Sequence, residues 1–224
     1  YFAKGYGHAD LARKIPVTTN TLFRWSSVST TLTAAATLKL AEENPAVNLT
    51  DKVTEHVSYW PAHGNKGHIR IRHLLSNRSG IIHYKKKKHC SNNISPDYAR
   101  RKHTSTRYNA KQGADVFRNQ KLCFVPGTAY KYSTFGYSLL GSAIEGGSGR
   151  PYAAWVNDRI KTPLGMASLR QATDTRTGFN QHCQILQQVL AGNSAWKLPG
   201  GGWESDILDL ARFANGLLQG SLLD

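Results

Sequence analysis

The stretch that decides the fold runs from residue 23 to residue 43 and reads FRWSSVSTTLTAAATLKLAEE. Its start is polar and β-branched, and the Ala/Leu-rich remainder has no Gly or Pro before Pro45. This pattern predicts a loop that enters a buried helix near Ser27. Free backbone N–H groups and the helix dipole stabilise an alkoxide at such a position, so Ser27 is a candidate nucleophile. The alternative is that Ser27 only caps the helix.

A second informative stretch covers residues 124–147 and reads FVPGTAYKYSTFGYSLLGSAIEGG. Its Pro-Gly pair predicts a turn, and Ser133 or Thr134 is placed to cap a helix that ends at Gly146-Gly147. The apolar face of this helix is formed by Phe135, Leu139, Leu140 and Ile144. Tyr132 therefore lies directly before a helix, where its phenol can serve a site.

Two further segments carry recognisable patterns: IRIRHLLSNRSGI at residues 69–81 and GGGWESDILDLARF at residues 200–213. In the second, Ser205 or Asp206 is placed to cap a helix, and the glycines let the backbone pass close to a pocket or form a plain loop.

These four segments resemble, in order, segments of the serine β-lactamase and penicillin-binding-protein superfamily. The resemblance is to its class C β-lactamase-like and esterase-like branch, including a mitochondrial subgroup of animals with bacterial relatives. The subgroup's SGI-x-HY sequence before a lysine-rich insertion resembles residues 79–84 and the run that follows. The first of the two further segments resembles a family helix that ends at Gly80. His73 is expected to pack or cap there, not to catalyse.

The resemblance implies an α+β fold of the β-lactamase/transpeptidase type: an antiparallel sheet flanked by helices, with a helical subdomain. Residues 1–224 are expected to form a single domain that is incomplete at both ends. The C-terminal strands, including a third motif of Lys-Thr-Gly or His-x-Gly type, are expected beyond residue 224.

The resemblance also assigns roles. Ser27 matches the nucleophile and Tyr132 the general base or proton relay. Thr134 stands where the family has Asn and, with Gly201 and Gly202, is expected to contact the substrate. Thr30 occupies the position of the family's lysine, where a neutral hydroxyl neither takes the serine proton nor holds an alkoxide well. Lys39 is more than two helical turns from Ser27, so it does not replace the family's lysine.

The net charge of +15 is concentrated in one segment. Residues 83–121 contain eleven Lys and Arg against two Asp, a net +9, which predicts a mobile basic insertion. A solvated charge run is favoured over contact with nucleic acid or an anionic lipid surface. His83, His89, Cys90 and His103 could together hold a metal ion, but their spacing matches no standard pattern. The three cysteines leave the redox compartment open.

The sequence therefore favours a serine hydrolase that forms an acyl-enzyme on an ester, amide or β-lactam carbonyl. The alternatives are a catalytically impaired binding or assembly protein, because of Thr30, and an interaction protein that uses the basic segment. No cofactor and no nucleic acid are expected; the partner is a small-molecule or peptide substrate. No apolar run approaches the roughly 18 residues of a membrane span. Periplasmic, secreted or mitochondrial localisation follows only by analogy.

Overall fold

The computed structural model describes residues 2–10, 13–84, 99, 107–172, 179–182, 185–188 and 195–223. Its α-helices are α1 (Ser29–Glu43), α2 (Val53–His56), α3 (Ile71–Leu75), α5 (Ala110–Asp115), α6 (Thr134–Ser148), α7 (Tyr152–Val156), α8 (Leu198–Gly201) and α9 (Ile207–Leu218). Short 3₁₀ turns are η1 (Ser26–Val28), η2 (Gly64–His68) and η4 (Ala195–Lys197), and η3 (Asn157–Lys161) is a π-helical turn. The strands are β1 (His8–Asp10), β2 (Ile15–Pro16), β3 (Phe23–Arg24), β4 (Arg170–Gln171), β5 (Phe179–His182), β6 (Ile185–Gln188) and β7 (Trp203–Ser205).

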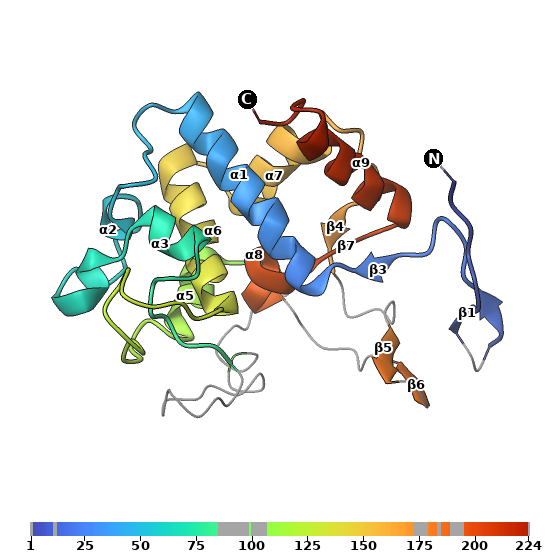
Figure 1. Cartoon of the computed structure of the whole chain (residues 1–224), viewed down its shortest axis with the longest axis horizontal. Helices are drawn as coiled ribbons and strands as arrows, with labels where there is room; N and C mark the ends of the chain where they lie inside the picture. Colours follow the sequence, from blue (N-terminus) through green and yellow to red (C-terminus); the bar gives the residue numbers. More distant parts are fainter. Residues whose placement is uncertain are drawn as a thin grey trace.

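Helices α1 and α6 form the centre of the molecule (Figure 1). The Ala/Leu face predicted for the first of them is buried, and α6 is buried along most of its length. Helices α2, α3 and α5 pack on α6, while α7 contacts both central helices. At Gly146 a Cβ would stand 1.7 Å from the carbonyl oxygen of His56, so only glycine allows α6 and the end of α2 to approach this closely.

An antiparallel three-stranded sheet in the order β3-β7-β4 lies beside the helices (Figure 1). The central strand β7 is fully buried, and its Glu204 accepts a hydrogen bond from Arg170 Nε at 2.8 Å. The ladder continues past β3, because the Trp25 N–H donates to the Trp203 carbonyl at 2.9 Å. The chain therefore leaves the sheet directly into η1 and α1. Two further antiparallel pairs are β1-β2 and β5-β6.

The predicted helix caps are tested by their hydrogen bonds. Ser133 caps α6, with its Oγ accepting from the Gly136 N–H at 3.1 Å, and Asp206 caps α9 by accepting from the Asp209 N–H at 2.8 Å. His73 has the expected capping role, because its Nδ1 accepts from the Arg70 N–H at the start of α3.

Two predicted helix ends are wrong. Helix α3 ends at Leu75 and not at Gly80, because Asn77, with φ of 55°, adopts the left-handed conformation first. Helix α6 runs past Gly146-Gly147 to Ser148 and is closed by Gly149 at φ 67°. Gly146 and Gly147 lie inside α6, where they allow neighbouring segments to pack closely, and they do not end the helix.

Residues 107–121, the last part of the predicted basic insertion, contribute buried side chains to the core, among them Ala114, Val116 and Phe117. Most of the insertion lies outside the described residues, as do three of the four residues of the candidate metal cluster, His89, Cys90 and His103. Cys123 is disulfide-bonded. Within the described ranges, no helix combines the length and apolarity needed to cross a bilayer.

Candidate active site

Ser27 lies in η1, the single turn between the sheet and α1. The residues two positions before and two positions after Ser27 form hydrogen bonds with β7. The Trp25 indole Nε1 donates to Ser205 Oγ at 2.8 Å, and the Trp203 N–H donates to Ser29 Oγ at 3.3 Å. Ser27 itself stays exposed. The sheet thus holds an accessible hydroxyl on a firmly anchored turn.

The hydroxyl of Ser27 does not cap a helix. Helix α1 begins at Ser29 with Val28 as its N-cap, and neither α1 nor the preceding 3₁₀ turn has a side-chain capping bond. Ser26, immediately before Ser27, has a φ of 47°, a conformation uncommon outside glycine. Backbone strain of this kind is concentrated at functional sites. The capping alternative for Ser27 is therefore not supported by the hydrogen bonds.

Thr30 lies one turn further along and is half-buried. Its Oγ1 donates a hydrogen bond to the backbone carbonyl of Ser27 at 2.7 Å. This hydroxyl is engaged with the backbone and carries no charge. Position 30 therefore supplies no cation to the Ser27 hydroxyl.

Tyr132 lies just before α6, and the residues on both sides of it form hydrogen bonds with Asn77. The Asn77 carbonyl accepts from the Lys131 N–H at 2.9 Å, and its Oδ1 accepts from the Ser133 N–H at 3.1 Å. Asn77 can make both bonds because it has left the helical conformation after α3. The loop after α3 thereby sets the position of Tyr132.

The hydroxyl of Tyr132 is buried and has no hydrogen-bond partner among the described residues. Its ring packs edge-on against the His83 ring, with centroids 5.5 Å apart. A buried polar group without a partner costs about 1–3 kcal/mol, and such groups in folded proteins are rare. Tyr132 is therefore a phenol to which the described residues supply no hydrogen-bond partner.

Helix α8 packs against both the turn that carries Ser27 and the start of α6, which follows Tyr132. A Cβ at Gly200 would stand 2.6 Å from Thr134 Cγ2 and 2.8 Å from the Thr134 carbonyl oxygen, so this glycine presses against the start of α6. A Cβ at Gly201 would stand 3.5 Å from the Ser26 carbonyl oxygen. The segments that carry Ser27, Thr134 and Gly201 therefore meet at α8 (Figure 1), although they are far apart in the sequence.

Gly202 lies on the sheet side of α8, where its carbonyl accepts from the Ala172 N–H at 2.7 Å. Tyr84, which sequence reasoning did not assign to the site, lies against the His83 ring at 4.2 Å between centroids. Burial raises the pKa of Tyr84, and a hydrogen bond with the Thr134 side chain partly offsets that rise. His83 and Tyr84 stand at the end of the stretch that resembles the family's SGI-x-HY segment. This position is the sequence signal that could have assigned them to the site.

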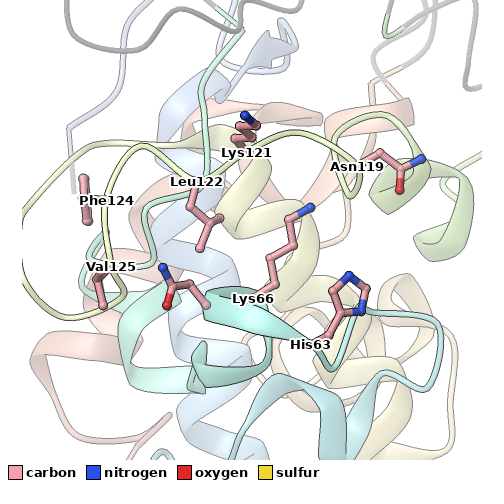
Figure 2. Close-up of a pocket in the computed structure, with 8 residues that line it drawn as sticks. His63, Lys66, Asn119, Lys121, Leu122, Phe124 and Val125 are labelled. Atoms are coloured by element: carbon pink, nitrogen blue, oxygen red, sulfur yellow. The ribbon is translucent and has the colours of Figure 1, made fainter.

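A cavity of about 450 Å³ lies elsewhere, between η2 and the chain that leads to the second motif. Figure 2 shows Lys66 reaching from η2 toward the segment that carries Lys121 and Asn119. None of the candidate site residues lines this cavity. The residues that line it are His63, Asn65, Lys66, Asn119, Lys121, Leu122, Phe124 and Val125.

Comparisons with known proteins identify the family and the fold of the chain. The family model described as Beta-lactamase matches residues 1–224. The human serine beta-lactamase-like protein LACTB, mitochondrial, is 27% identical over 282 residues, which cover 98% of this chain and 51% of the relative. A D-stereospecific amidohydrolase from Streptomyces sp. matches in structure with a TM-score of 0.70 and 27% identity, over 92% of this chain and 63% of the other.

The hydrolase EstCE1, described as having promiscuous acyltransferase activity, matches all of this chain and 66% of its own, with a TM-score of 0.79 and 21% identity. This likeness shows the fold. The chain belongs to the Beta-lactamase family, as its sequence predicted, and it has the β-lactamase/transpeptidase-like α+β fold. It spans about half the length of the mitochondrial relatives it matches. Family members are serine hydrolases, including amidases, esterases and penicillin-binding proteins.

Proposed function

We propose that this chain carries an acyl-transfer site in which Ser27 attacks an ester, amide or β-lactam carbonyl and Tyr132 relays the proton. The Ser27 Oγ bonds to the carbonyl carbon and its proton passes to Tyr132, while the phenol gives its own proton to the leaving group as the old acyl bond breaks. Water then hydrolyses the acyl-enzyme. The observation that carries the proposal is the buried hydroxyl of Tyr132, which has no hydrogen-bond partner in the part of the chain that the structure describes and lies on a segment that α8 joins to the Ser27 turn.

The second candidate function is a binding protein that hardly turns over its ligand. The Thr30 hydroxyl supports this alternative, because it is neutral and donates to the backbone carbonyl of Ser27. Loss of one member of a catalytic group commonly lowers the rate by several powers of ten. The two candidates share the pocket and differ in rate.

A substitution at position 30 tests the hydrolase proposal. We expect Thr30→Lys to increase the rate of Ser27 labelling by a fluorophosphonate about a hundredfold or more, because an amine one turn from the nucleophile can accept its proton. Labelling is followed by intact-protein mass, and turnover by hydrolysis of a chromogenic β-lactam and a short-chain ester.

Thr31→Lys is the matched control, because residue 31 is exposed on the same helix and lies about 100° around the helix axis from residue 30. Ser27→Ala should abolish labelling in every background. If folded Thr30→Lys is not labelled at Ser27, the hydrolase proposal fails. If Thr30→Lys is labelled rapidly while the parent chain binds ligands without turnover, the binding-protein alternative describes the parent.

A further inference from the structure

The cavity beside η2 combines positive charge with apolar surface (Figure 2). Lys66 and Lys121 line it, and none of the described residues that line it is acidic. Its apolar surface comes from Leu122, Phe124 and Val125. Ligand sites of small molecules commonly pair an apolar lining with a few polar or charged groups. The composition of this cavity therefore suits an anion that also carries an apolar group.

The ammonium group of Lys66 is the part of this cavity that most favours an anion. Its Nζ donates a hydrogen bond to the Arg118 carbonyl, which fixes its position but brings no opposite charge. Burial lowers the pKa of Lys66, because the charged form loses contact with water. No carboxylate among the described lining residues offsets this cost. An anion bound in the cavity would offset it and would favour the charged form of the amine.

The backbone on both sides of the cavity is anchored to the core. On the η2 side, the Trp60 indole Nε1 donates to the Lys66 carbonyl at 3.3 Å. On the other side, the Cys123 N–H donates to the Gly80 carbonyl at 2.7 Å. Gly80 has a φ of 77°, and a Cβ there would stand 2.3 Å from the Phe124 carbonyl oxygen, so this close approach requires glycine. A preformed cavity spares a ligand the cost of ordering the chain.

We propose that this cavity binds a phosphate monoester of an apolar alcohol, with the phosphate on Lys66 and Lys121 and the apolar group on Leu122 and Val125. A phosphate monoester carries a charge of about −1.5 to −2 at neutral pH, which matches two lysines better than a single carboxylate does. The Asn119 amide adds a donor for its several oxygens. A volume of about 450 Å³ is large enough for such a molecule. The site is separate from Ser27 and does not depend on the proposed function.

Three probes test the inference by calorimetry at pH 7: phenyl phosphate, inorganic phosphate and phenol. We expect phenyl phosphate to bind the parent chain about tenfold or more tightly than either fragment, because it alone uses both the charge and the apolar surface. Equal affinities for phenyl phosphate and inorganic phosphate would reduce the site to a patch of positive charge and overturn the inference. Failure of phenyl phosphate to bind would also overturn it.

Substitutions locate the two halves of the ligand. Lys66→Met should weaken phenyl phosphate about ten- to a hundredfold, and Lys121→Met, at an exposed lysine, about two- to fivefold. Lys111→Met is the matched control, because Lys111 is exposed on α5 and does not line the cavity. An equal loss in Lys111→Met and Lys121→Met would show binding to the general positive charge and overturn the inference.

Val125→Ser tests the apolar half without touching a charge. Val125 is 49% exposed, so the fold should tolerate the change. We expect it to weaken phenyl phosphate about two- to fivefold and to leave inorganic phosphate unchanged. Unchanged affinity for both probes would contradict the proposed orientation. Thermal denaturation shows that each variant is folded.

Two further measurements separate the site from the Ser27 pocket and identify the source of the phosphate. Ser27→Ala should bind phenyl phosphate as the parent does, whereas loss of binding would place the ligand at Ser27 and overturn the inference. Phosphatidylcholine vesicles are then tested with and without phosphatidic acid. Sedimentation that needs both phosphatidic acid and Lys66 would assign the phosphate to a lipid headgroup, and binding of phenyl phosphate without sedimentation would assign it to a soluble ester.

Discussion

Single residues set the chemical character of the Ser27 turn. Ser26 is held at a φ of 47° while Trp25 and Ser29 are bonded to β7, so the turn keeps a conformation that an isolated segment would avoid. Thr30 then uses its hydroxyl on the Ser27 carbonyl. The turn therefore contains a residue in a strained conformation, Ser26, and is followed by a neutral hydroxyl, that of Thr30, at the position where the sequence resemblance places the family's lysine.

Glu145 gives a pH-dependent prediction at the same scale. Burial raises its pKa, and the Tyr152 N–H, which donates to its Oε1 at 3.0 Å, partly offsets the rise. A carboxyl whose folded-state pKa lies above its unfolded value stabilises the fold most when protonated, and that contribution is lost as the pH rises through the folded-state pKa.

We therefore expect Glu145→Gln, which keeps an acceptor for the Tyr152 N–H, to gain stability relative to the parent as the pH rises from 4 to 7. Urea unfolding at both values measures the difference. Glu42→Gln is the control, because Glu42 is an exposed residue of α1 that pairs with Lys39. A difference between Glu145→Gln and the parent that stays constant with pH would contradict the argument.

At the scale of elements, the start of α6 links stability to the candidate site. Ser133 Oγ accepts from the Gly136 N–H at 3.1 Å and donates to the Ile82 carbonyl at 2.6 Å. The cap therefore fastens α6 to the loop before His83. Tyr132 is the preceding residue, so its position depends on this bond pair as well as on Asn77.

We expect Ser133→Ala to lower the free energy of unfolding by about 1–2 kcal/mol, because the helix loses its cap and the Ile82 carbonyl its donor. Labelling of Ser27 in a Thr30→Lys background should fall with it. Ser148→Ala at the other end of α6, where the hydroxyl bonds are exposed, should change stability by no more than about 0.5 kcal/mol. Equal losses at the two ends would contradict the proposed role of the cap.

At the scale of the whole molecule, one tyrosine joins three parts of the fold. The Tyr152 hydroxyl on α7 shares a 2.7 Å hydrogen bond with the Thr33 hydroxyl on α1 and accepts from Trp203 Nε1 on β7 at 3.0 Å. Thr33 also donates to the Pro199 carbonyl on α8. Tyr152 is fully buried, and this burial raises its pKa, so the group is a neutral phenol.

Tyr152→Phe should lower the free energy of unfolding by about 1–3 kcal/mol, because the buried Trp203 N–H loses its acceptor. Guanidinium unfolding followed by tryptophan fluorescence measures the loss. Tyr130→Phe is the matched control, since Tyr130 is 69% exposed, and should have almost no effect. A loss no larger than that of Tyr130→Phe would show that the network does not stabilise the fold.

Local sequence signals predicted the long helices well. Helices α1, α6 and α9 have strong patterns of apolar residues and short-range caps, and Ser133 and Asp206 were among the expected cap residues. The family and its fold were also predicted, from four motifs in order, and are confirmed. The ends at Gly80 and Gly146 were predicted wrongly because a glycine signal does not distinguish a helix terminus from close packing, which depends on a distant partner such as the His56 carbonyl.

The sequence by itself determined the helices, the family and the candidates Ser27 and Tyr132, because these follow from residues within a few turns of one another. Only the tertiary structure decided that Phe23 pairs with Ser205 and that α8 contacts both the Ser27 turn and the start of α6. Strands of two or three residues have almost no local pattern, and contacts across most of the chain are selected by the packing of the complete core.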